Sequence, residues 1–169
     1  MGDNISSVAE ISSLRRSELF QALTPEEMGK LAPLCMEVSI DQDTPLFSEG
    51  REATYIYLVI EGQISLHKAI RAPHSRPLRR TVVSICRARD VVGWSALVAP
   101  YKYTLSAVAW DSTKLARIDS RMLRRALDMH SHIGFKVMRS LAAIMARHLG
   151  QTIDTLVNEH EITLSGLKT

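Results

Sequence analysis

The chain has 169 residues, of which 46% are hydrophobic and 23% are charged, and its formal net charge is +3. This length fits one domain that buries a core without disulfides or a structural metal. The charge is too small to indicate nucleic-acid binding by itself, and no run of about 18 apolar residues is present to span a membrane. The cysteines, Cys35 and Cys86, have apolar neighbours and no metal-site spacing, so we expect buried, reduced thiols in a cytoplasmic protein.

The beginning of the chain is predicted to be helical after a flexible, serine-rich N-terminus at residues 1–13. A helical pattern extends over residues 14–34. Within it, Thr24 and Glu27 have the spacing of a capping box, and Pro25 occupies the first helical position. This combination predicts a helix that begins at Pro25.

From Glu37 the pattern changes to alternation of β-branched and aromatic residues. Turn residues, including Gly50 and Gly62, separate short apolar runs, and we expect both glycines to adopt positive φ or to approach other backbone closely. About eight short strands, evenly spaced over residues 37–119, are typical of a β-barrel or sandwich. The runs are residues 38–40, 45–47, 55–60, 64–66, 82–85, 108–110 and 115–118.

Two helices are predicted to follow the strands. Ser120 is the expected N-cap of a short helix over residues 121–129. A long helix is expected over residues 132–157, where apolar residues recur at steps of three and four. Such a helix spans about 38 Å, which is longer than a small barrel needs to cover itself. Residues 158–169 are a tail without a clear pattern.

Residues 92–98 read Val-Gly-Trp-Ser-Ala-Leu-Val and residues 103–107 read Tyr-Thr-Leu-Ser-Ala, downstream of the two turn glycines. With the element order, this resembles the cyclic nucleotide-binding domain of catabolite-activator-type regulators, kinase regulatory subunits and cyclic-nucleotide-gated channels. The resemblance covers about residues 14–157. It implies a mainly β fold with helices, in which an eight-stranded β-roll, a jelly-roll-like barrel, is flanked by an N-terminal helix and by a short and a long C-terminal helix (residues 120–157).

The resemblance also implies a ligand site, in which the backbone N–H groups of a short helix after Gly93 face a cyclic phosphate. In the family, a Glu after this Gly accepts the ribose hydroxyl and a later Arg binds the phosphate. Here Trp94 and Tyr103 hold these places and supply neither an acceptor nor a charged fork, so weak or no binding of cyclic AMP and cyclic GMP is expected. The candidate ligand-binding residues are Gly93, Trp94, Ser95, Ala96, Leu97, Lys102, Tyr103, Thr104 and Ser106.

The sequence leaves several roles open. The Trp94 ring either fills the emptied pocket or covers the mouth of the barrel, or it forms a platform for a different planar ligand. Tyr101 and Tyr103 share this ambiguity, since alternate positions of an extended segment point to one face. The basic run at residues 71–80 is either a solvated loop or a patch for an acidic partner or a nucleic-acid backbone.

The long helix is expected to mediate a homodimer, because its apolar residues continue beyond what the barrel can cover. Small residues such as Ala142 and Ala146 would let a second helix approach closely. The predicted dimer residues are Val137, Leu141, Met145, Leu149, Ile153 and Leu156.

The leading hypothesis is a stand-alone, non-catalytic sensor or regulatory module, and the alternative is a ligand-free scaffold, plugged by Trp94, for dimerisation or protein docking. The residues show no acid–base, nucleophile or metal-ligand set, so no enzyme, cofactor or metal is expected. The resemblance leaves a cyclic nucleotide or another small anionic molecule as the ligand class. Too few residues follow the long helix for a helix-turn-helix, so a downstream protein, and not nucleic acid, is the expected partner of this chain alone.

Overall fold

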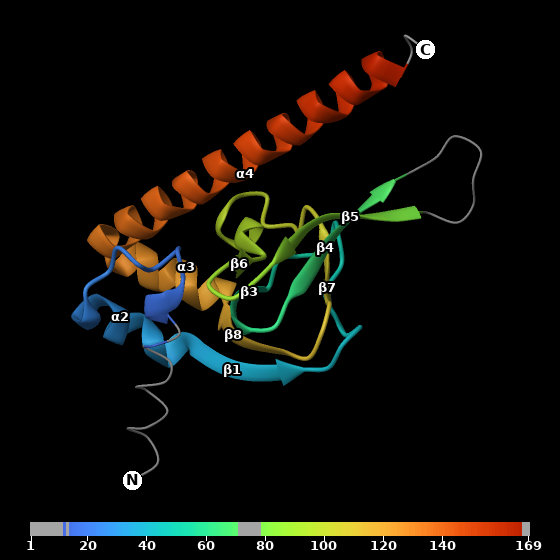
Figure 1. The fold of residues 1–169 in the computed structure, drawn as a ribbon. Helices are drawn as coiled ribbons and strands as arrows, with labels where there is room; N and C mark the ends of the chain where they lie inside the picture. The colour runs from blue at the N-terminus through green and yellow to red at the C-terminus, as the bar shows by residue number, and fades with distance from the viewer. Residues whose placement is uncertain (1–11, 13, 71–78, 167–169) are drawn as a thin grey trace.

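The computed structural model describes residue 12, residues 14–70 and residues 79–166 (Figure 1). Within these ranges, eight strands form two four-stranded sheets, with neighbour orders β1-β8-β3-β6 and β2-β7-β4-β5, and these neighbours pair antiparallel. The predicted eight-stranded β-roll is confirmed. The strands are β1 (Cys35–Ile40), β2 (Pro45–Phe47), β3 (Tyr55–Glu61), β4 (Ile64–Ile70), β5 (Arg79–Cys86), β6 (Val91–Val92), β7 (Ser106–Ala109) and β8 (Thr113–Asp119).

Strand β3 separates the two cores of the molecule, because both of its faces are buried. On one face, Ile56 and Leu58 join the core that lies under the helices. On the other face, Tyr57 and Val59 join the interior of the roll. This double burial explains the unbroken apolar run in the sequence of β3, where a half-exposed strand would alternate with polar residues.

The N-terminal helix α2 (Pro25–Leu31) begins at the predicted capping box and continues into a 3₁₀ turn, η1 (Ala32–Leu34). The Glu27 N–H donates to Thr24 Oγ1 at 3.2 Å, and the Thr24 N–H donates to a Glu27 carboxylate oxygen at 2.8 Å. The helical pattern over residues 14–34 therefore resolves into a helical stretch that includes residues 14–16, turns over residues 17–23 and the regular helix α2.

The short helix α3 (Ser120–Met129) forms as predicted, but its N-cap is Asp119 and not Ser120. The Asp119 carboxylate accepts from the N–H groups of Arg121 and Met122, both at 2.9 Å. A carboxylate is a good cap because it also carries negative charge at the positive end of the helix. The Ser120 hydroxyl instead donates to the carbonyl of Ala53 at 2.9 Å, which ties the helix to the loop before β3.

The long helix α4 (Ser131–Gly166) passes the predicted end at residue 157, crosses one side of the roll and projects beyond it (Figure 1). Its first half packs on the main core through Ile133, Val137, Leu141 and Ile144. Val137 and Leu141, predicted to face a partner helix, are therefore buried in the core of their own chain, at 0% and 1% exposure. No helix in the described ranges is both long and apolar enough to cross a membrane.

Candidate functional site

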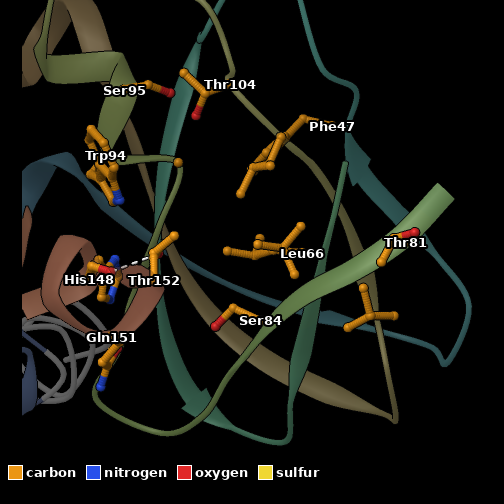
Figure 2. A pocket seen from close by; sticks show the side chains of 14 residues that line it. Phe47, Leu66, Thr81, Ser84, Trp94, Ser95, Thr104, His148, Gln151 and Thr152 are labelled. Carbon is orange, nitrogen blue, oxygen red and sulfur yellow. Dashed lines mark hydrogen bonds between the residues drawn. The ribbon is translucent and has the colours of Figure 1, made fainter. Parts of the chain in front are cut away.

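A cavity of about 450 Å³ opens between the roll and the middle of α4 (Figure 2). Pockets that hold small molecules have volumes of about 300–1,000 Å³. Strands β2, β4 and β5, the segments around residues 94 and 104, and one face of α4 all contribute to its wall. The lining residues are Phe47, Leu66, Thr81, Val82, Val83, Ser84, Gly93, Trp94, Ser95, Thr104, Leu105, His148, Gln151 and Thr152.

Gly93 and the 3₁₀ helix η2 (Trp94–Leu97) form one end of the cavity, where the resemblance placed a short helix. Gly93 has φ of +80°, and a Cβ atom there would lie 3.1 Å from both the Tyr103 ring and the Tyr55 carbonyl oxygen. Glycine alone fits this left-handed, crowded position without strain. The turn leaves Trp94 and Ser95 on the cavity wall, whereas Ala96 and Leu97 are buried in packing and do not line it.

Trp94 is half-buried and forms a wall of the cavity, and it also packs against the main core. Figure 2 shows its indole beside His148 and Thr152, on the opposite side of the cavity from Phe47 and Leu66. The ring therefore lines the cavity without filling it. This position agrees with a platform for a ligand and disagrees with a plug.

Tyr103, at the place of the family's Arg, is turned away from the cavity and into the roll. Its ring stacks on Phe47, with centroids 3.7 Å apart and planes 8° apart. Its hydroxyl donates to the Tyr55 carbonyl at 2.8 Å and accepts from the Tyr55 N–H at 3.1 Å. Burial raises the pKa of this phenol above its ordinary value. Tyr103 thus satisfies the backbone of β3 and is not available to a ligand.

Thr104 lines the cavity, but Ser106 does not, because its hydroxyl accepts from the Glu49 N–H at 3.0 Å. Glu49 forms an ion pair with Lys68 and accepts from the Ala69 N–H at 3.1 Å. The Lys68 hydrogen bond, followed by the backbone bond, lowers the pKa of the Glu49 carboxyl. The Lys68 ammonium also donates to the Thr104 carbonyl at 3.3 Å. The positive charge beside Thr104 is therefore already neutralised.

The segment before Tyr103 is not a regular strand, since Tyr101 has φ of 57°. Tyr101 and Tyr103 consequently differ in exposure, at 39% and 4%, and do not share a face. Lys102 between them is exposed and lies outside the lining. The Arg124 guanidinium of α3 lies 4.2 Å from the centre of the Tyr101 ring and donates to the Ala96 carbonyl, so α3 supports the back of η2.

Helix α4 contributes three lining residues that the sequence interpretation missed, His148, Gln151 and Thr152. They continue the face of α4 that carries Leu141 and Ile144, at steps of three and four. The Thr152 hydroxyl donates to the His148 carbonyl at 2.9 Å. A change from apolar to polar residues along one helix face was the available signal. Thr81–Ser84 of β5, with Phe47 and Leu66, were also missed, because the register that brings them together is not local in sequence.

Other candidate groups do not form a second centre in the described part of the chain. No three His, Cys, Asp or Glu residues there come together as metal ligands. Cys35 and Cys86 are both buried, and burial raises the pKa of the Cys86 thiol to about 12, which keeps it protonated. The basic run at residues 71–80 lies mostly outside the described residues.

Comparison with known proteins gives a consistent result. The family model of the cyclic nucleotide-binding domain matches residues 37–130. The chain is 27% identical over 139 residues to the Cyclic AMP receptor protein of Thermus thermophilus, a match that spans 80% of this chain and 59% of that protein. The N-terminal domain of a transcriptional regulator from Streptomyces coelicolor has a TM-score of 0.65 at 25% identity, with 80% of this chain and 93% of that chain covered. A cyclic nucleotide-binding domain from Methylobacillus flagellatus shares the fold, with a TM-score of 0.75 at 19% identity over 90% of this chain and 83% of that chain.

Proposed function

Because the chain belongs to the cyclic nucleotide-binding domain family, we propose that it is a non-catalytic sensor or regulatory module in signal transduction. The open cavity beside Trp94 carries this proposal, since it offers a small molecule a site of ordinary size. A ligand there would contact the roll and α4 together. Its binding energy would therefore depend on the position of α4, which is the requirement for a ligand to shift a conformational equilibrium.

The module is proposed to bind cyclic AMP and cyclic GMP weakly or not at all. Trp94 has no acceptor for a ribose hydroxyl, and Tyr103 uses its hydroxyl on the Tyr55 backbone. Each missing charge-assisted hydrogen bond is worth about 1.5–3 kcal/mol. The loss of both corresponds to about 3–6 kcal/mol, or on the order of 10²–10⁴-fold in affinity.

Isothermal titration calorimetry of the chain with cyclic AMP and cyclic GMP, at ordinary salt, tests this proposal. We expect no saturable heat at low micromolar nucleotide, with the same result for the non-cyclic control AMP. A micromolar or tighter Kd for either cyclic nucleotide would contradict weak binding and identify the module as a conventional cyclic nucleotide sensor.

A homodimer through α4 is the second part of the proposal, and one observation favours it. Exposed apolar side chains form a stripe along α4 beside the face that packs on the roll. Met138, Met145, Leu149 and Ile153 follow one another at steps of seven, four and four, with the small residue Ala142 between the first two. A continuous apolar stripe on a projecting helix usually marks an interface, and a second copy offers a matching stripe. The alternative function, a scaffold that acts by dimerisation alone, would use the same surface.

We place the module in the cytoplasm. The Cys86 thiol is buried and free in the structure, although an oxidising compartment favours disulfides. We propose that the module passes its signal to a downstream protein that contacts the dimer.

A further inference from the structure

The lining of the cavity carries no carboxylate, ammonium or guanidinium group among the described residues. This is unusual for a chain in which 23% of the residues are charged. Two cations that bond carbonyls of the lining segments are committed elsewhere. Lys68, which donates to the Thr104 carbonyl, pairs with Glu49, and Arg124, which donates to the Ala96 carbonyl, lies over the Tyr101 ring. An anion that entered the cavity would lose its hydration without gaining a counter-charge, and burial of an unpaired charge is costly.

The wall instead offers a large apolar and aromatic surface. The indole of Trp94 lies on one side, and Phe47 and Leu66 lie on the other (Figure 2). Val82 and Val83 of β5 extend this surface toward solvent, at 44% and 53% exposure. Flat apolar walls favour aromatic ligands, because stacked rings gain contact at both faces and lose little conformational freedom.

Neutral polar groups lie around this apolar surface. Ser84 on β5 and Thr104 provide hydroxyls, and α4 provides the His148 imidazole and the Gln151 amide. These groups both donate and accept hydrogen bonds without carrying a fixed charge. They can orient an uncharged molecule that has a hydroxyl, amine or amide at its edge.

We propose that the cavity binds an uncharged aromatic molecule, which stacks on Trp94 and directs its polar edge to His148 and Gln151 of α4. This ligand class rests on the proposed sensor function and replaces the cyclic nucleotide with a neutral molecule. The small anion that the family resemblance implied is the ligand that this lining disfavours.

A pair of fluorescent probes tests the proposal directly. N-phenyl-naphthylamine is neutral, whereas anilinonaphthalene sulfonate has the same aryl groups and one negative charge. Both are titrated into the full chain at about pH 8, where imidazoles are generally neutral. We expect the neutral probe to saturate one site per chain and to bind at least about tenfold more tightly than the sulfonate. Equal or tighter binding of the sulfonate, or no saturable binding of the neutral probe, would overturn the proposal.

Substitution of Ser84 assigns the binding to this cavity. Ser84 is exposed on the edge strand β5 and lines the cavity, so Ser84→Arg adds a positive charge there at little risk to folding. We expect Ser84→Arg to strengthen sulfonate binding by about tenfold or more. The matched control is Ser39→Arg, since Ser39 is also exposed on an edge strand, β1, of the other sheet. An equal effect of both variants would show that the probes bind elsewhere and would overturn the assignment.

The stacking wall has its own matched pair. Trp94→Leu should weaken the neutral probe by about tenfold, while Trp110→Leu, at a half-exposed tryptophan outside the lining, should leave it unchanged. An unchanged Kd in folded Trp94→Leu contradicts the proposal, and if this variant does not fold, the Ser84 result decides. Tight binding of cyclic AMP would contradict the weak cyclic-nucleotide binding proposed above, whereas absence of both cyclic AMP and probe binding would overturn this inference alone.

Discussion

Gly62 and Gly50 have similar backbone angles but different surroundings. Substitution of each one therefore separates the cost of backbone strain from the cost of a steric clash. Gly62 has φ of +83°, and a Cβ atom there would lie 2.6 Å from Thr113 Oγ1 and 2.7 Å from the Ser112 carbonyl oxygen. Gly50 has φ of +81° with nothing within 4 Å. We expect Gly62→Ala to destabilise the fold by about 1–3 kcal/mol, and Gly50→Ala by less, because it adds strain without a clash. Chemical denaturation of both variants measures the difference in the free energy of unfolding. Equal losses of stability would mean that the turn at Thr113 moves to make room for the added Cβ atom.

The hydroxyl of Tyr103 is predicted to be structural. In Tyr103→Phe the Tyr55 N–H and carbonyl lose their partner inside the roll, which should cost about 1–3 kcal/mol. Tyr101→Phe is the matched control, since Tyr101 is partly exposed, and its effect should stay within about 0.5 kcal/mol. Thermal melts of both variants provide the measurement. Equal stability of the two would show that water replaces the Tyr103 hydroxyl and that this side chain is less enclosed than the structure indicates.

At the residue scale, the sequence predicted the structure well at positions where the backbone conformation itself requires a particular residue type. Gly50 and Gly62 could be assigned to tight turns, and both have positive φ. The direction of Tyr103 could not be predicted, because it depends on the left-handed Tyr101 before it and on Phe47, a stacking partner far away in sequence. The place of an expected ligand contact therefore holds a packing residue.

At the scale of elements, an ion pair joins α2 to the first turns of α4. The Lys136 ammonium donates to both carboxylate oxygens of Glu27 at 2.8 Å, and His132 Nε2 lies 3.6 Å from one of them. The Lys136 hydrogen bond, then the Thr24 N–H, lowers the pKa of Glu27 below its ordinary value of 4.5. The stabilisation is therefore complete above pH 4.5 and is lost as the pH falls through the lowered pKa.

This linkage predicts the acid response of Glu27→Gln. Between about pH 5 and about pH 3, the melting temperature of the natural chain should fall more steeply than that of the variant, which has no carboxylate to protonate. Glu26→Gln, at an exposed position in the same helical turn, should keep the natural slope. The assignment fails if Glu26→Gln and Glu27→Gln give the same slope.

The number and order of the elements followed from local patterns, but their mutual placement did not. The capping box at Thr24 and the apolar spacing of α4 are encoded within a few residues, so both helices could be located. Which face of α4 meets the roll depends on packing across the whole molecule. Val137 and Leu141 were consequently assigned to the wrong side of the helix, and His148 was not recognised as part of the site.

At the scale of the whole molecule, the apolar stripe of α4 predicts a homodimer that charge should disrupt. The double variant Leu149→Glu with Ile153→Glu should sediment as a monomer at tens of micromolar, where the natural chain should be a dimer, because like charges would meet in an apolar interface. The control is Met122→Glu with Met129→Glu, which adds the same charge to exposed residues of α3. A monomeric natural chain, or loss of the dimer in both double variants, would rule out the α4 interface.

The length of α4 gives the molecule a mechanical property. The cavity meets this helix at Thr152, and the helix continues to Gly166, so the projecting part acts as a lever about 21 Å long at 1.5 Å per residue. A tilt of about 10° at the cavity would move the last turn by about 4 Å, which is larger than the helix shifts of about 1–2 Å common at subunit interfaces. A small adjustment of α4 to a molecule beside Trp94 would therefore grow with distance along the helix, and the largest displacement would occur where the chain has left its own roll and another molecule could contact it.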